Sequence, residues 1–187
     1  MTRLEAFLLL RRHVRDGAFR RRALAVEAVM ETLAGRLGAE PARWGVLGLL
    51  AELDAGFTAR NPTRRGLVAE EMLAASDLPP EDRAALREQW RAEAGSRLVV
   101  RALAAAVPAA RLLLEGVDGL AGLRALEPSE LAGLVEDPSI APEASRTRVA
   151  LLAPEGLPPA ALLAFARARL LEVADDVFPR GGGAVAG

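Results

Sequence analysis

Residues 22–30, with the sequence RALAVEAVM, and residues 44–54, with the sequence WGVLGLLAELD, decide the fold of this chain. Around the first stretch, Val26, Met30 and Leu33 recur at steps of three and four residues, which places them on one buried face of an α-helix. The second stretch is apolar on most sides, as is typical of a helix at the centre of a core. The two stretches therefore predict two helices in the hydrophobic core.

The rest of the chain is also predicted to be helical. Ala, Leu, Arg and Glu dominate and favour helices, whereas the strand-forming residues Ile, Thr and Tyr are scarce or absent. Gly38 is predicted to end the first helix, and Pro41 to begin the next, which runs to about residue 53. A loop is expected over 55–65, and Pro108 is expected to kink or split its helix. Further helices are predicted over 66–75, 80–95, 96–114, 129–136, 142–152 and 158–177.

The predicted fold class is all-α, as a compact multi-helix bundle. The 187 residues suit one domain, or one domain with a helical extension. We expect a helical core over 1–115 and an extension over 116–178 that packs on this core, with closely spaced glycines between them. A flexible tail is expected over 179–187 because of its glycine content.

Composition excludes several kinds of site. Every basic residue is Arg, so the chain has no Lys for a Schiff base or a Walker-type phosphate loop. The absence of Cys excludes disulfides and thiolate metal sites, and His13, the one histidine, excludes sites that need two imidazoles. The net charge of −1 gives no overall field toward anions, so an anion site would have to be a local cluster.

No segment is predicted to be a membrane span or a signal peptide. The three leucines at 8–10 are followed at once by Arg11 and Arg12, which makes the apolar run too short. Aromatic residues, at 4%, are too few for the stacking that single-stranded nucleic acid requires. We therefore expect a cytoplasmic protein that binds neither membrane nor nucleic acid.

The order and spacing of these segments resemble the HDIG-type branch of the HD-superfamily metal-dependent phosphohydrolases. The resemblance covers about residues 8–114 well and the chain up to 177 more weakly. It implies a compact HD-domain-like helical bundle. The segments that carry it are RALAVEAVM at 22–30, WGVLGLL at 44–50, GLVAEEML at 66–73, LPPE at 78–81 and RALAA at 101–105.

The residues that would carry the chemistry of that family are replaced. Arg22 stands where the family has its first metal-binding His, and Ala51 and Glu52 stand where it has an adjacent His-Asp pair. Asp54, which follows that pair, still matches the branch. Other positions of the family's His and Asp side chains hold Arg65, Gln89 and Val107.

These replacements leave no set of metal ligands. A catalytic divalent metal needs several unprotonated nitrogen or oxygen ligands at one point. Ala51 offers no ligand, and the guanidiniums of Arg22 and Arg65 repel cations. The resemblance therefore implies an inactive member with no catalytic residues, no metal and no cofactor.

If the chain folds like the HD domains that it resembles, Arg22, Glu52 and Arg65 converge in the former metal pocket, with Asp54 and Gln89 close to them. Two interpretations of this cluster stay open. One is a structural salt bridge that fills the pocket, since buried charges are normally paired. The other is an anion pocket that binds a small phosphate compound or a nucleotide without hydrolysing it.

Three functions follow from these observations. The first is a catalytically inactive HD-like domain that acts as a binding, regulatory or scaffolding module. The second is an HD-superfamily phosphohydrolase with non-standard ligands, such as Glu52 and Asp54 with backbone or water. The third is a pure protein-interaction domain with a filled former site, whose partner is another protein or, through the final helix, a second copy of the chain.

Overall fold

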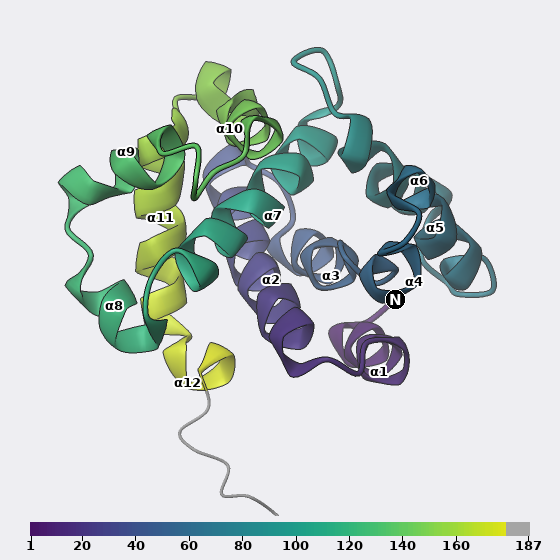
Figure 1. Cartoon of the computed structure of the whole chain (residues 1–187). Helices are drawn as coiled ribbons and strands as arrows, with labels where there is room; N and C mark the ends of the chain where they lie inside the picture. The colour runs from purple at the N-terminus through teal and green to yellow at the C-terminus, as the bar shows by residue number, and fades with distance from the viewer. Residues whose placement is uncertain (179–187) are drawn as a thin grey trace, which may run out of the picture.

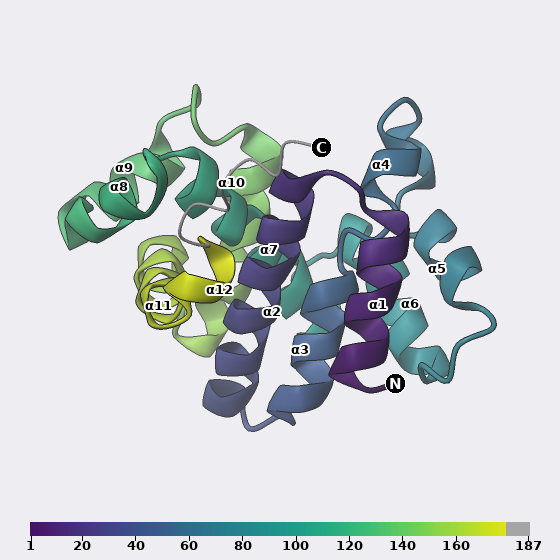
Figure 2. The ribbon, with the colours of Figure 1, turned by 90° about the horizontal axis from the view of Figure 1, so that it is seen from below.

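The computed structural model describes residues 1–178, and its regular elements are all α- or 3₁₀-helices, which confirms the predicted all-α class. The proposed tail over 179–187 lies outside the described residues. In two perpendicular views, α2, α3 and α7 lie in the middle of the molecule (Figures 1 and 2). Helices α8, α9, α11 and α12 lie on one side of them, and α1, α4, α5 and α6 on the other.

The central pair consists of α2 (Gly17–Leu37) and α3 (Pro41–Leu50), which lie side by side as predicted. Gly38 ends α2 in the left-handed conformation, with φ of 71°. Gly48 lets the two backbones approach, because a Cβ atom there would lie 2.7 Å from the carbonyl oxygen of Val26. This close contact brings the side chains near the end of α3 next to α2.

The third central helix, α7 (Leu98–Glu115), packs against both α2 and α3. It continues through Pro108, so of the kink or split expected at this residue the split does not occur. Nearly all of its residues from Ala102 to Leu113 are buried, and packing along the whole helix outweighs the one hydrogen bond that a proline removes.

On one side of the centre, the first helix packs against α3 and a series of short helices follows α3. The loop expected over 55–65 was partly wrong, because it contains α4 and the 3₁₀-helix η1. Asp54, at the end of a tight turn after α3, accepts the amide hydrogen bonds that start α4. The elements are α1 (Arg3–His13), α4 (Ala55–Thr58), η1 (Pro62–Arg64), α5 (Leu67–Leu73), α6 (Pro80–Glu88) and η2 (Gln89–Arg91).

On the other side, α11 packs against α2, α7 and α9. The glycine-rich stretch expected as a break contains the short helix α8, and the single helix expected over 158–177 is divided into α11 and α12 at Val173. The elements are α8 (Gly119–Ala125), α9 (Pro128–Glu136), α10 (Glu143–Val149), η3 (Ala150–Glu155), α11 (Pro159–Glu172) and α12 (Ala174–Val177).

Over residues 1–178 no single helix has both the length and the apolar composition needed to cross a membrane. One pair of segments, Glu143–Glu155 and Pro159–Glu172, meets these two criteria only when taken together, and it is bent by 91°.

Candidate functional site

Arg22 and Glu52 form a forked ion pair between α2 and the turn after α3. The Nε and Nη2 groups of Arg22 donate to the two carboxylate oxygens of Glu52, with 3.0 Å between Nη2 and Oε1. The side chains are only 11% and 7% exposed. Nη1 of Arg22 also donates to Glu115 at the end of α7, at 2.8 Å, and its guanidinium lies over the ring of Phe19. All the charge of Arg22 is therefore engaged by carboxylates.

The pKa of Arg22 reflects this arrangement. Burial lowers the pKa, but the hydrogen bonds and the negative charge of Glu52, with a smaller contribution from Glu115, raise it above its ordinary value. Arg22 is therefore a permanent cation paired with Glu52, and its guanidinium is not free to bind another anion.

Asp54 is fully buried and holds the start of α5. Its Oδ2 atom accepts hydrogen bonds from the backbone N–H groups of Gly66, at 2.7 Å, and Ala69, at 3.3 Å. Burial raises the pKa of the carboxyl, and these two hydrogen bonds together with the charge of Arg65 partly oppose that rise. The residue acts as a cap for a helix remote in sequence, which is a structural role.

Gln89 is also fully buried, at the start of η2. Its Nε2 group donates to the carbonyl oxygens of Ala51, at 2.9 Å, and Leu86, at 3.2 Å. Its amide therefore ties the turn after α3 to α6 and keeps Glu52 in place. The Oε1 atom has no hydrogen-bond partner within the described part of the chain.

Arg65 does not join the pair of Arg22 and Glu52. Its guanidinium lies over the ring of Trp90, 4.9 Å from the ring centre. A second guanidinium, that of Arg148 from α10, lies 4.8 Å from the same ring centre. The charge of Glu52 raises the pKa of Arg148 and that of Arg65 lowers it, so the three side chains belong to one cluster.

The structure therefore places the five residues singled out in the sequence in two neighbouring groups. Arg22 pairs with Glu52, while Arg65 lies near Asp54 and stacks on Trp90. The sequence reasoning missed Arg148, which lies about 80 residues after Arg65 in the proposed extension and shows no pattern that links it to the pocket. Both guanidiniums of this second group lie over Trp90, which directly follows Gln89 in the sequence.

The residues of the pocket do not fit a divalent metal. Both carboxylate oxygens of Glu52 accept from Arg22, and one oxygen of Asp54 accepts from two backbone amides. Residues 1–178 also contain no group of three or more His, Cys, Asp or Glu side chains arranged to hold a metal ion. The charge of Glu52 is neutralised by Arg22, and the two further guanidiniums of Arg65 and Arg148 act on the same group of residues, which disfavours a cation there.

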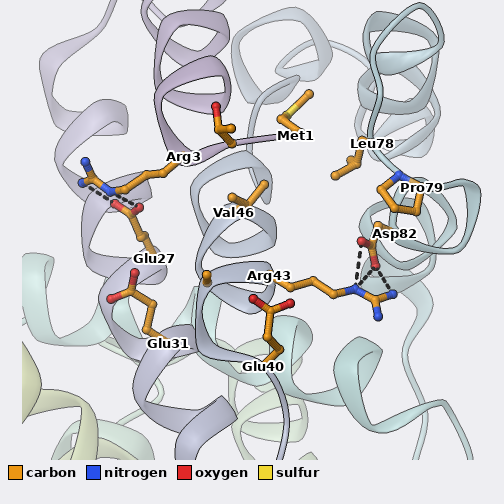
Figure 3. A pocket seen from close by; sticks show the side chains of 12 residues that line it. Met1, Arg3, Glu27, Glu31, Glu40, Arg43, Val46, Leu78, Pro79 and Asp82 are labelled. Atoms are coloured by element: carbon orange, nitrogen blue, oxygen red, sulfur yellow. Dashed lines mark hydrogen bonds and ion pairs between the residues drawn. The ribbon is translucent and has the colours of Figure 1, made fainter.

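A separate surface cavity of about 330 Å³ lies between α1, α2, α3 and α6, and two buried carboxylates in its walls are paired with arginines (Figure 3). Arg3 binds buried Glu27 on one wall, with 2.6 Å between Nε and Oε1. Arg43 binds buried Asp82 on the opposite wall, with 2.7 Å between Nη2 and Oδ1. The two buried carboxylates of this cavity therefore already have guanidinium partners.

The geometry thus gives a nearly buried ion pair of Arg22 and Glu52 and a second arginine group around Trp90. No protein-family model, curated protein or solved structure matches this chain.

Proposed function

We propose that this protein is a catalytically inactive HD-like helical domain, a pseudo-phosphohydrolase. In this proposal it acts as a binding, regulatory or scaffolding module and binds a phosphate-containing ligand without a metal. The observation that carries the proposal is the forked pair of Arg22 and Glu52, which stands at two of the positions where the resemblance implies metal ligands.

The chemistry of the pair supports a non-hydrolytic role. Hydrolysis of a phosphate ester by this family depends on a metal that lowers the pKa of a bound water. Arg22 occupies both oxygens of Glu52, and Ala51 beside it has no donor atom. A metal would have to displace a guanidinium from a nearly buried carboxylate, which would leave the nearly buried Arg22 paired with the half-exposed Glu115 alone among the carboxylates described as its partners.

The remaining arginines support ligand binding. Arg65 and Arg148 lie beside the neutralised pair, and neither forms a salt bridge within the described residues. If the former metal site were merely filled by side chains, it would not be expected to hold two such cations, because buried charges without partners destabilise a fold. This favours a binding module over a pure interaction domain.

The experiment that tests the proposal is a hydrolysis assay on phosphate monoesters and diesters with Mn²⁺, Ni²⁺, Co²⁺ or Mg²⁺ added. We expect no turnover above that of the Glu52→Ala variant with any of these metals. Metal-dependent hydrolysis by the wild-type chain that is lost in Glu52→Ala and in Asp54→Ala would overturn the proposal and favour an enzyme with unusual ligands.

A further inference from the structure

We propose that Arg65, Trp90 and Arg148 form a binding site for a compact phosphate dianion, either inorganic phosphate or the terminal group of a phosphate monoester. This inference rests on the proposed function and deepens it, because it names the residues and the chemical class of the ligand. It moves the anion site away from Arg22, which is engaged by two carboxylates.

The first argument is a group of buried hydrogen-bond donors that have no acceptor. These are the Nε group of Arg65, the indole Nε1 group of Trp90, and the Nε and Nη2 groups of Arg148. Each of these atoms is almost inaccessible to solvent and has no partner within the described residues. Buried donors are normally satisfied in folded proteins, so four of them on three neighbouring side chains indicate a site that receives acceptor oxygens.

The second argument is charge. Arg65 and Arg148 carry two positive charges and form no salt bridge within the described residues. Glu52, whose charge acts on Arg148, is already in a forked pair with Arg22. Asp54, whose carboxyl interacts with the charge of Arg65, already accepts two backbone hydrogen bonds. Burial lowers the pKa of Arg148 to about 10, so the side chain is still a cation at neutral pH. Two guanidiniums that form no salt bridge within the described residues match one anion with several acceptor oxygens.

The third argument is that the ring of Trp90 is already covered by both guanidiniums. The ring is therefore not free to stack on a nucleobase, and its contribution is the indole N–H group. This favours recognition of the phosphate group itself over recognition of a base.

The fourth argument is that the backbone fixes both arginines. Arg65 is followed by Gly66, whose φ is 81° and whose Cβ, if present, would lie 2.8 Å from the Cα of Arg87 and 2.9 Å from Trp90 Cδ1. Only glycine fits there, so the segment before α5 lies directly against η2. Arg148 comes from α10, which packs against α7.

A neighbouring arginine provides a matched control. Arg146 lies on the same helix as Arg148 and is also half-buried, but its Nη1 group donates to the carbonyl oxygen of Ala141 at 3.2 Å. The replacement Arg146→Gln therefore removes one charge from α10 without touching the donors around Trp90.

The test uses inorganic phosphate as the probe and the full chain purified with a chelator. Binding is measured by calorimetry, and the melting temperature is measured with and without phosphate, at pH 8 and at an ionic strength matched with chloride. We expect phosphate to raise the melting temperature of the wild-type protein and of Arg146→Gln by mass action. We expect Arg65→Gln and Arg148→Gln each to weaken phosphate binding about tenfold to a hundredfold.

Stability in the absence of phosphate separates binding from a structural role. If Arg148 is a buried cation kept for a ligand, Arg148→Gln melts no lower than the wild-type protein while it loses phosphate binding. Trp90→Phe keeps an aromatic face for the guanidiniums but replaces the indole with a smaller ring that has no N–H group, and it should weaken phosphate binding less than Arg148→Gln does.

Three results would overturn the inference: no phosphate effect on the wild-type protein, equal effects of phosphate and chloride, or phosphate binding that persists in Arg148→Gln. None of these results depends on the hydrolysis assay. The proposed lack of catalysis would therefore stand even if the phosphate site failed.

Discussion

Arg22 and Glu52 are 30 residues apart in sequence and form a forked, nearly buried ion pair that joins α2 to the turn after α3. Because Glu52 lies in the buried turn after α3, its carboxylate has little access to water and depends on the guanidinium for its stability in the core. The pair thus joins the two central helices. Its two residues stand at positions where the proposed resemblance to HD phosphohydrolases implies metal ligands.

Removing one partner of this pair should destabilise the fold strongly. We expect Glu52→Ala to lower the free energy of unfolding by about 3–5 kcal/mol, because the nearly buried Arg22 keeps its charge and loses the forked carboxylate, while it retains its contact with the more exposed Glu115. The double variant Arg22→Met with Glu52→Leu should recover most of this loss, since it leaves no unpaired charge. Urea denaturation of the three proteins measures both effects.

The matched control is Arg111→Ala, which removes an exposed pair between Arg111 and Glu115 on α7. Such surface pairs contribute about 0.5 kcal/mol or less, so the change should be small. Equal losses from Glu52→Ala and Arg111→Ala would show that the pair of Arg22 and Glu52 is not what joins α2 to α3.

The close approach of α2 and α3 should depend on Gly48. We expect Gly48→Ala to lower the free energy of unfolding by about 1–3 kcal/mol, because the new methyl group would lie 2.7 Å from Val26 O and 2.9 Å from Glu27 Cα. The control is Gly35→Ala, on the exposed part of α2, where the methyl group meets nothing within 4 Å. Its free energy of unfolding should rise by up to about 1 kcal/mol, because alanine favours a helix over glycine. A stable Gly48→Ala protein would contradict the packing described above.

The buried carboxyl of Asp54 should give a specific pH dependence. Its pKa is raised above its ordinary 3.8 by burial, so protonation favours the folded state, and this contribution is complete below 3.8 and lost as the pH rises through the raised pKa. Asp54→Asn cannot titrate. We therefore expect the stability of the wild-type protein relative to Asp54→Asn to increase as the pH falls from about 7 to about 3.5.

Denaturant unfolding at a series of pH values measures this difference. Asp137, whose pKa is lowered by the side-chain and backbone hydrogen bonds of Ser139, serves as a control of opposite sign. The wild-type protein should lose stability relative to Asp137→Asn over the same fall in pH. Parallel pH curves for the wild-type protein and Asp54→Asn would contradict the environment described for Asp54.

The sequence predicted the central helices well because their evidence is periodic. The spacing of Val26, Met30 and Leu33 identifies one buried face, and Gly38 with Pro41 marks the turn between α2 and α3. The short helices α4 and α8 were not predicted, since four or seven residues are too few for a periodic pattern and their stability comes from tertiary contacts.

The candidate site was only partly accessible to sequence reasoning. Arg22, Glu52 and Asp54 lie on or next to the two patterned helices, so their surroundings follow from helix geometry and from the resemblance. Arg148 reaches Trp90 only because α10 packs against α7, and a contact between segments so far apart in the chain leaves no local signal.

The resemblance to the HD frame can be tested by restoring the residues that it implies. We expect a chain that combines Arg22→His, Ala51→His, Glu52→Asp and Val107→Asp to bind about one equivalent of a transition metal per molecule. All four positions lie in or beside the three central helices, which pack on one another. A folded quadruple variant that takes up no metal on dialysis would argue against the HD-like frame.

The central claim is that a guanidinium stands where a metal would be held, and the metal content of the wild-type protein tests it most directly. The measurement is elemental analysis of protein purified without a chelator, with the quadruple variant as the positive control. The account predicts no stoichiometric Mn, Fe, Co, Ni, Zn or Mg in the wild-type protein. A stoichiometric metal that is lost in Glu52→Ala would contradict it.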